Sequence, residues 1–375
     1  MKNLIAFFRE QPVNLLLVAL PLALFAEWGH WGELWVFIFS SAAIVPLAGL
    51  IGRSTEALTV YTGPRLGGLL NATLGNAAEL IITIVAIREG LLELVKASIT
   101  GSILGNILLV MGMAMFLGGF KNGIQRFDRH HASRSAILLM LSVIALLVPS
   151  MLSSAIGPET SIRVEALSLG VAAIMIVLYA AGLFYSFRSK DGAVAKAITA
   201  DTRATWETAE AKPSELVKNH EHWSLRTSLI FLALSTVGVV VMSELLVAVV
   251  EPVVASLGVS EFFLGVILIP LIGNVAEHLI AVKVAVENQM DLSVEIAVAS
   301  SLQIALFVAP VLVFISLLMG NPLQLIFNSF ELLALIVGVF IAVMVSQDGE
   351  SNWLEGAELL AVYLILALAF FLLPV

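Results

Sequence analysis

The chain of 375 residues contains no cysteine, which excludes disulfide bonds, zinc–thiolate sites and thiol nucleophiles. Charged residues are also scarce, because they make up 13% of the chain whereas a soluble domain has roughly 25%. No basic stripe of the kind that binds nucleic acid is present, so no nucleic-acid partner is expected. Apolar residues reach 59%, more than one globular core of this length can bury, and the surplus must face lipid.

Apolar runs of about 20 residues, long enough for a helix to cross a bilayer, recur along the whole chain. They show no period-two alternation, which favours helices over a closed barrel. The predicted fold class is therefore an all-α membrane protein with about 11 transmembrane helices. The predicted helices are 12–27, 33–52, 65–87, 94–118, 134–154, 164–187, 225–250, 260–286, 292–319, 323–346 and 355–374. Segment 53–63 is expected to form a short amphipathic extension.

The positive charges predict the orientation, because Lys and Arg gather in cytoplasmic loops. Lys2 and Arg9 precede the first helix, and further bases lie around the loop after the fourth helix and in the hydrophilic stretch 188–224. With eleven helices these segments share one side, so we expect a cytoplasmic N-terminus and a C-terminus outside. The expected location is the plasma (inner) membrane. The stretch 188–224 is interpreted as a solvated linker, with a regulatory element as the alternative.

The two halves of the chain carry the same motif. Residues 75–79 (Gly-Asn-Ala-Ala-Glu) return at 273–277 (Gly-Asn-Val-Ala-Glu), a shift of 277 − 79 = 198 residues. The predicted organisation is an N-terminal helix in 1–32, a first five-helix repeat in 33–187, the linker 188–224 and a second five-helix repeat in 225–375. An odd number of helices per repeat inverts the second repeat. Inverted repeats are typical of alternating-access transporters, whose site lies near the middle of the membrane.

Each copy of the motif places a glutamate deep in an apolar segment, where an ionised carboxylate costs roughly 2.5–3.5 kcal/mol or more. Glu79 lies near the middle of 65–87, and Glu277 lies within 260–286. A structural carboxylate hydrogen-bonded within the bundle is the plain alternative. The duplication of the motif favours a functional pair that carries the exchange of cation and proton.

The residues before each glutamate suit a cation site lined by oxygen atoms. Glycine weakens a helix locally, so Gly75 predicts a break in the first copy, and Pro270 with Gly273 predicts one in the second. Such a break turns backbone carbonyl groups toward a cavity. Asn76 and Asn274 precede each glutamate by three positions, share its helix face and offer a carbonyl oxygen. Oxygen is the ligand that Ca2+ requires, and the absence of cysteine disfavours a softer metal.

Polar side chains on the following helix of each half complete the predicted metal site. They are Ser102, Asn106, Ser300, Ser301 and Gln303. Serines in membrane helices often only bond the backbone or aid packing, which is the alternative interpretation. The candidates for a proton path are His278, Glu56 and Glu244, for which a packing histidine and solvated helix ends are the alternatives. Arg88, Lys283 and Glu331 are expected at the membrane interface.

Two close carboxylates in a medium of low dielectric hold protons when no metal is bound, and they must ionise to bind a divalent cation. Protons and Ca2+ then compete for one site. If only the neutralised forms cross between inward and outward states, exchange follows without a separate proton path. No resident cofactor is expected, since Ca2+ is the transported ion.

At these motifs the sequence resembles the Ca2+/cation–proton antiporter family of the cation/Ca2+ exchanger superfamily. The resemblance rests on residues 75–80, 273–278 and 300–308 and covers nearly the whole chain after the first helix. It implies ten core helices in two inverted halves plus one N-terminal helix. It also implies that Glu79 and Glu277 bind cation and proton alternately, with Gln303 and neighbouring serines assisting.

The predicted function is secondary active transport that exchanges Ca2+ for H+ by alternating access. An exchanger coupled to Na+ or K+, or one that prefers Mn2+ or Cd2+, is the alternative, and a cation channel is a further one. An enzyme is not expected, because no metalloprotease pair or nucleophile elbow is present. The expected partners are Ca2+, H+ and membrane lipids, and a homo-oligomer is left open.

Overall fold

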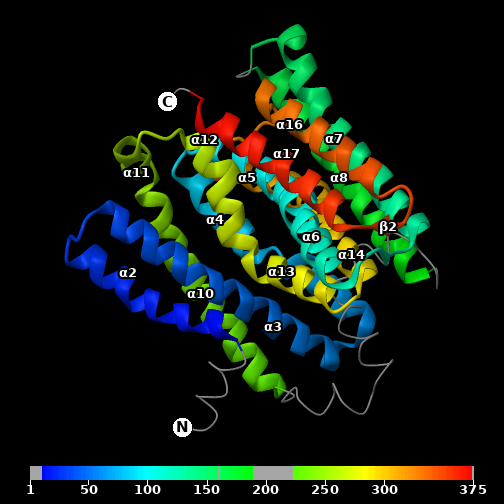
Figure 1. Ribbon diagram of the computed structural model, residues 1–375. Coiled ribbons are helices and arrows are strands. Elements are labelled where there is room, and N and C mark those ends of the chain that lie inside the picture. The colour runs from blue at the N-terminus through cyan, green and yellow to red at the C-terminus, as the bar shows by residue number, and fades with distance from the viewer. Residues whose placement is uncertain (1–10, 159–160, 189–222, 374–375) are drawn as a thin grey trace.

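Helices make up nearly all of the computed structural model, which describes residues 11–158, 161–188 and 223–373 (Figure 1). The first half contains η1 (Pro12–Val18), α2 (Ala19–Trp28), α3 (Glu33–Leu74), α4 (Ala77–Arg88), α5 (Leu92–Leu104), η2 (Gly105–Val110), α6 (Met111–Asn122), α7 (Arg129–Ile156) and α8 (Ile162–Arg188). The second half contains α10 (Leu225–Ala248), α11 (Val250–Leu257), α12 (Glu261–Phe263), η3 (Leu264–Leu268), α13 (Ile269–Val286), α14 (Met290–Gln303), η4 (Ile304–Val308), α15 (Ala309–Met319), α16 (Ser329–Val345) and α17 (Trp353–Phe371). Strands β1 (Gln125–Arg126) and β2 (Glu350–Ser351) pair antiparallel.

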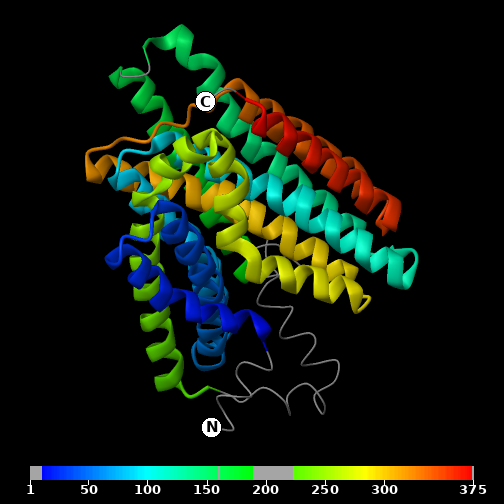
Figure 2. The same ribbon diagram turned by 60° about the vertical axis from the view of Figure 1, so that its left-hand side comes forward.

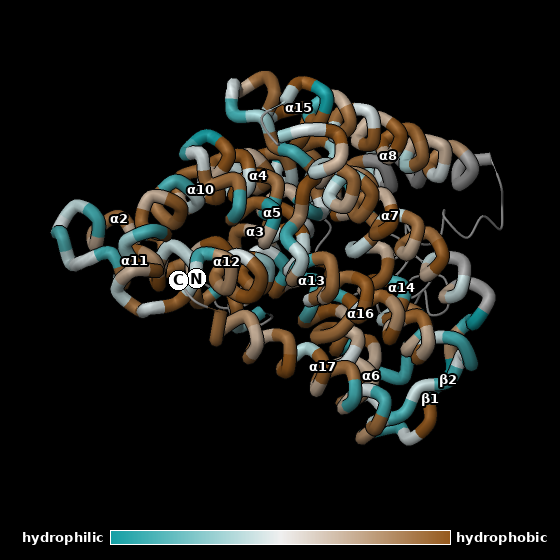
Figure 3. The backbone as a smooth tube through the Cα atoms, turned by 90° about the horizontal axis from the view of Figure 1, so that it is seen from above, coloured by the Kyte–Doolittle hydropathy of each residue, from teal (hydrophilic) through white to brown (hydrophobic). Residues whose placement is uncertain are grey.

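Eight helical stretches in the part of the chain that the structure describes are long and apolar enough to cross a membrane. Two further apolar helices, Pro12–Trp28 and Ser329–Val345, are shorter, and the predicted segment 65–87 is divided between the end of α3 and α4. Bulky apolar side chains are exposed along the helices, and Figure 3 shows hydrophobic colour along most of their length. The chain is therefore an all-α, multi-pass membrane protein, as predicted. Residues 1–10 and 189–222, with Lys2, Arg9 and most of the predicted linker, lie outside the described residues.

Helix α3 differs from the prediction, which divided its residues among two membrane helices and an amphipathic extension. The helix continues through the polar stretch, where Arg53 donates from Nη2 to Oδ1 of Asn14 (3.0 Å). A Cβ atom at Gly67 would lie 2.5 Å from Cβ of Thr59. Eight residues of a straight helix span about 12 Å, so α3 bends sharply between these two residues.

The predicted helix 323–346 is wrong in its first six residues, because α16 begins only at Ser329. The preceding chain is not helical but carries buried apolar side chains, which made it resemble a helix in the sequence. Its backbone N–H groups are bound by serine hydroxyl groups: Leu323 by Ser316 (2.7 Å), Leu325 by Ser168 (3.1 Å) and Phe327 by Ser150 (2.9 Å). These bonds satisfy a non-helical backbone that lipid could not.

Helices α2, α3 and α10 form one group beside the remaining helices, as Figures 1 and 2 both show. Helix α10 packs along α3, and this pair contacts the two helices that carry the repeated motif, α4 and α13. Helix α5 crosses η3 at close range: a Cβ atom at Gly101 would overlap the carbonyl group of Val266. The motif helices are thus enclosed by elements of both halves of the chain.

Matched asparagine contacts relate the two halves at the C-terminal ends of the motif helices. Asn321, in the chain after α15, donates from Nδ2 to the carbonyl oxygens of residues 87 (2.9 Å) and 88 (3.5 Å), where α4 ends. Asn122, where α6 ends, donates from Nδ2 to the carbonyl oxygens of residues 285 (3.3 Å) and 286 (3.2 Å), where α13 ends. The acceptors differ by the repeat shift of 198, so each half binds the end of the other half's motif helix.

Tryptophan side chains lie exposed near two separate connections of the chain. Trp28, Trp31 and Trp35, around the α2–α3 turn, are 81%, 52% and 50% exposed, and Trp353, which follows β2, is 49% exposed. The α2–α3 turn lies at the left of Figure 1 and β2 lies at the right.

Candidate functional site

The two motif glutamates occupy different positions in their helices. The helix is interrupted at Gly75 and Asn76, and α4 begins again at Ala77, so Glu79 lies in the first turn of α4. Its side chain is buried, at 3% exposure. Glu277 lies in the interior of α13 and is half-buried.

The glutamates lie where α4 and α13 approach each other. A Cβ atom at Gly273 would lie 2.8 Å from Cγ of Glu79, and one at Gly75 would lie 3.6 Å from Oε1 of Glu277. Each carboxyl side chain therefore lies over the glycine of the other copy. Because glycine has no side chain, Gly75 and Gly273 leave room for these two carboxyl groups. This placement agrees with the expectation that the two acids share one site.

Each glutamate has a serine partner at the same sequence spacing. Ser102, on α5, donates from Oγ to Oε1 of Glu79 (3.3 Å), and Ser300, on α14, donates from Oγ to Oε2 of Glu277 (3.0 Å). Both pairs are 23 residues apart. The structure thus brings together four of the residues that the sequence proposed, in two equivalent pairs.

The amide side chains of the site bridge the two repeats. Asn76 donates from Nδ2 to Oε1 of Gln303 (2.6 Å), while its own Oδ1 is buried without a hydrogen-bond partner. Asn274 is 2% exposed and lies close to the carboxyl group of Glu79, and its Nδ2 makes no hydrogen bond of standard geometry. A buried amide oxygen that lacks a donor is available to a cation.

The remaining candidates are divided between the site and its surroundings. Asn106, in η2, contacts His278 (Oδ1 to Nε2, 3.2 Å), and Ser301 donates to backbone carbonyl oxygens of Ala297 (3.0 Å) and Ile103 (3.5 Å). Neither contact involves a motif glutamate, so the predicted metal-binding role of these residues stays a prediction.

The predicted proton-path acids lie on the neighbouring helices α3 and α10. Glu244, on α10, is 45% exposed and forms an ion pair with Arg88 (3.0 Å). Glu56, on α3, is half-buried. Their predicted role in proton transfer is not tested by these positions.

The prediction of a broken helix is confirmed in the first copy of the motif and wrong in the second. Helix α13 runs through Gly273 and Asn274 without interruption. Its distortion is a π-helical turn upstream, η3, which ends just before Pro270 and accommodates the missing N–H of the proline. Two further π-helical turns, η2 and η4, follow the serine positions in both halves.

Glu331 is enclosed within the protein, so its side chain does not snorkel outward as the sequence suggested. Its side chain is 1% exposed and forms a capping box with Asn328 at the start of α16: Oε2 accepts from the backbone N–H of Asn328 (2.7 Å). The hydroxyl group of Thr100 lies 3.4 Å from Oε1. The sequence signal was present as Asn three residues before Glu ahead of an apolar run. The exposed side chains of Arg88 and Lys283 agree with their predicted positions.

The ligand chemistry of the site is that of a hard cation. Within the described ranges, no group of three or more His, Asp or Glu side chains is arranged to hold a metal. Two carboxylates with neighbouring amide and hydroxyl oxygens instead match the oxygen ligands that Ca2+ takes. Two carboxylates also neutralise one divalent cation, which lowers the cost of holding it in the membrane interior.

Comparison with known proteins identifies the family. The sequence profile described as "Sodium/calcium exchanger protein" matches residues 32–188 and 227–372, which include both motif helices. The chain belongs to the sodium/calcium exchanger family. Among family members, a protein of Aphanothece halophytica named "Ca(2+)/H(+) antiporter" is 45% identical, with 96% of each chain covered. "Ca(2+)/H(+) antiporter ChaA" of Bacillus subtilis is 42% identical, with 96% of this chain and 98% of the relative covered.

A solved structure of another family member supports the fold. The structure titled "Structure of native YfkE" superposes with a TM-score of 0.80 and 39% sequence identity, and it covers 96% of this chain and 100% of that chain. The resemblance deduced from residues 75–80 and 273–278 is therefore confirmed at the level of the family.

Proposed function

We propose that the protein is a secondary transporter that exchanges Ca2+ for H+ by alternating access. The observation that carries this proposal is the placement of Glu79 and Glu277, from symmetry-related motifs, against each other's glycine at the crossing of α4 and α13. Relatives 45% and 42% identical over nearly the whole chain carry the name Ca2+/H+ antiporter, which supports the choice of ions.

The chemistry follows from charge balance. With Ca2+ bound, both glutamates are ionised and the cation neutralises them. When Ca2+ leaves, protons from that side bind the carboxyl groups and restore neutrality in the low-dielectric interior. Either Ca2+ or protons neutralise the carboxylates, so the site can cross between the two sides in both forms. One crossing with Ca2+ and the return crossing with protons together complete one exchange.

The other predicted site residues have supporting roles in this proposal. Ser102 and Ser300 orient the carboxyl groups, and Asn76, Asn274 and Gln303 add amide oxygens. For Asn106 and Ser301 a ligand role requires a change from the contacts seen here. His278, Glu56 and Glu244 stay candidates for proton transfer. We place the N-terminus in the cytoplasm and the protein in the plasma membrane.

The test uses the purified protein in proteoliposomes. An imposed pH gradient should drive uptake of 45Ca above its equilibrium level, and dissipation of the gradient with a protonophore should abolish that accumulation. Uptake that requires Na+ or K+ and ignores pH would instead support the alternative coupling. Flux that never concentrates 45Ca would support a channel and reject the proposal.

A further inference from the structure

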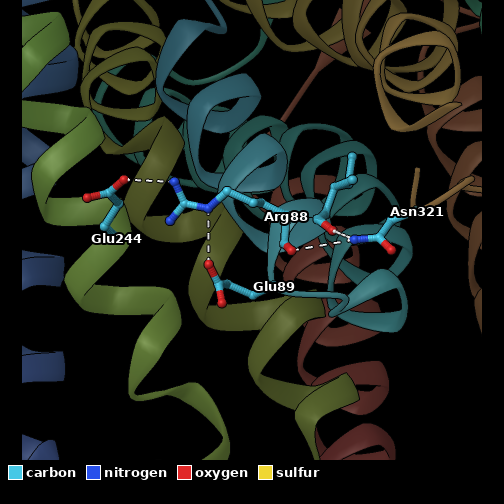
Figure 4. Close-up of polar contacts among 5 residues, drawn as sticks. Arg88, Glu89, Glu244 and Asn321 are labelled. Carbon is cyan, nitrogen blue, oxygen red and sulfur yellow. Dashed lines mark hydrogen bonds and ion pairs between the residues drawn. The ribbon is translucent and has the colours of Figure 1, made fainter. Parts of the chain in front are cut away.

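The end of α4 that follows Glu79 is tied to helix α10 by an ion pair (Figure 4). Arg88, the last residue of α4, donates from Nη1 to Oε1 of Glu244 on α10 (3.0 Å) and from Nε to Oε1 of Glu89 (3.1 Å). Asn321 binds the last carbonyl groups of the same helix. Three separate parts of the chain therefore meet at the end of α4.

Sequence composition singles out this ion pair. Glu79 and Arg88 are the charged residues of α4, and Arg226 and Glu244 are those of α10. The residues of α10 that are buried near Glu244 are Met242, Ser243, Leu246 and Val247, none of which is charged. The contact between the two helices thus combines a neutral packed surface with one charged contact at the end.

The repeat supplies an internal comparison. Both motif helices have an asparagine bound at their ends, but the position equivalent to Arg88 in the second repeat is Val286, since 88 + 198 = 286. A valine side chain forms no ion pair. Among the described residues, the asparagine contact is common to both ends, whereas Val286 leaves the α13 end without a counterpart of the Arg88–Glu244 ion pair.

We propose that Arg88 and Glu244 form a latch that holds α10 against α4 in this conformation and parts when the site opens toward that end. The proposal rests on the alternating-access function proposed above. The side chains of Arg88 and Glu244 are 53% and 45% exposed, and ion pairs so exposed contribute little to stability. A weak contact can form and break in every transport cycle. Helix α4 can shift when this ion pair breaks, because the chain is interrupted at the other end of the helix, at Gly75 and Asn76.

The first test links the two helices covalently. Because the chain has no cysteine, an Arg88→Cys/Glu244→Cys variant carries the sole thiols, and a short bifunctional thiosulfonate reagent can join them reversibly. The matched control is Arg126→Cys/Glu350→Cys, at the exposed ion pair between β1 and β2 (3.1 Å). Linkage is verified by mass spectrometry, and 45Ca uptake driven by a pH gradient is measured before linking, after linking and after reduction.

Linking positions 88 and 244 should abolish uptake and reduction should restore it, while the linked control should keep its rate. Undiminished uptake by protein linked at 88 and 244 would overturn the latch. Failure of the proposed function is distinguishable, because the unlinked Arg126→Cys/Glu350→Cys control would then show no pH-driven uptake either.

The second test weakens the latch without covalent chemistry. In Arg88→Gln or Glu244→Gln, the KM for Ca2+ should fall about two- to five-fold at the α4 end and rise by a similar factor at the opposite end, as measured in oppositely oriented vesicles. The double variant should add little to either single change. Glu89→Gln, which removes the neighbouring carboxylate, is the control and should leave both KM values unchanged. Equal changes at the two ends would mark a structural role and reject the latch.

Discussion

The two copies of the Gly-Asn-x-Ala-Glu motif share their sequence but not their backbone. In the first copy the helix is interrupted, and Glu79 occupies the first turn of α4. In the second copy α13 is continuous, and Glu277 occupies its interior. Since a helix end leaves backbone groups without intrahelical partners, the first copy can offer backbone groups that the second keeps bonded. The repeated motif therefore supplies the same side chains to both halves of the site, whereas the backbone around these side chains differs between the two copies.

The difference extends to burial. Glu79 is nearly inaccessible at 3% exposure, whereas Glu277 is half-buried. The serine partners are equivalent, so they do not account for the difference in burial. Four predictions separate what the copies share from what distinguishes them.

The largest effect is expected from the glutamates themselves. Glu79→Gln and Glu277→Gln should each reduce pH-driven 45Ca uptake to the background of protein-free vesicles, because a carboxamide neither gives up a proton nor supplies the charge for a divalent cation. Glu358→Gln, at an exposed carboxylate on α17, is the control and should transport normally. Robust transport by either motif variant would show that one carboxylate suffices.

The glycines come next, because each faces the other copy's glutamate. In Gly273→Ala the new Cβ atom would lie 2.8 Å from Cγ of Glu79, so Ca2+ affinity should fall about ten-fold or more. In Gly75→Ala the new Cβ atom would lie 2.8 Å from the carbonyl oxygen of Asn71, and alanine favours a continuous helix, which opposes the interruption. Gly52→Ala is the control, since nothing lies within 4 Å of that position. Wild-type affinity in Gly75→Ala would show that the interruption is dispensable.

The serine pairs should respond equally. Ser102→Ala and Ser300→Ala each remove one hydrogen bond to a carboxylate, which is worth about 1.5–3 kcal/mol, so transport should fall at least several-fold. Ser142→Ala removes a hydroxyl group that bonds only its own helix and should have little effect. A loss confined to one of the two serine variants would extend the asymmetry of the copies to their hydroxyl partners.

The smallest effect is expected from the amide contact between the repeats. A double-mutant cycle with Asn76→Ala and Gln303→Ala should give a coupling of about 0.6 kcal/mol in the free energy of unfolding in detergent, the average for such bonds in membrane proteins. Asn76→Ala combined with Ser142→Ala should be additive. Additivity in the Asn76–Gln303 cycle would show that this contact does not hold the halves together.

The sequence was informative where a strong periodic or duplicated signal exists. Ten of the eleven helices predicted from the apolar runs are present as separate apolar helices. The prediction succeeds because a backbone in lipid must satisfy its own hydrogen bonds, which favours helices. The shift of 198 residues placed Ser102 and Ser300 in equivalent positions, and the structure shows each bonded to its own glutamate. That alignment required no knowledge of tertiary structure.

The errors arose where tertiary contacts override local signals. Pro270 suggested a break at the motif, but an upstream π-helical turn absorbs the proline. The predicted helix 33–52 ends before Arg53, but α3 continues through this residue, which donates to Asn14. Glu331 suggested an interface, although Asn328 before it marked a buried helix cap. In these cases the deciding contacts involve residues outside the local pattern, or a capping residue just ahead of the apolar run.

The exposed indole rings have a consequence for how the protein sits in lipid. Indoles concentrate at the boundary between hydrocarbon and headgroups. Trp28, Trp31 and Trp35 belong to one connection and Trp353 to another, and these connections lie at opposite sides of Figure 1, so we expect the two groups of rings to lie at separate membrane boundaries. The depth of these rings in the bilayer can therefore be measured by the quenching of tryptophan fluorescence with brominated lipids. A change in bilayer thickness would alter that fluorescence.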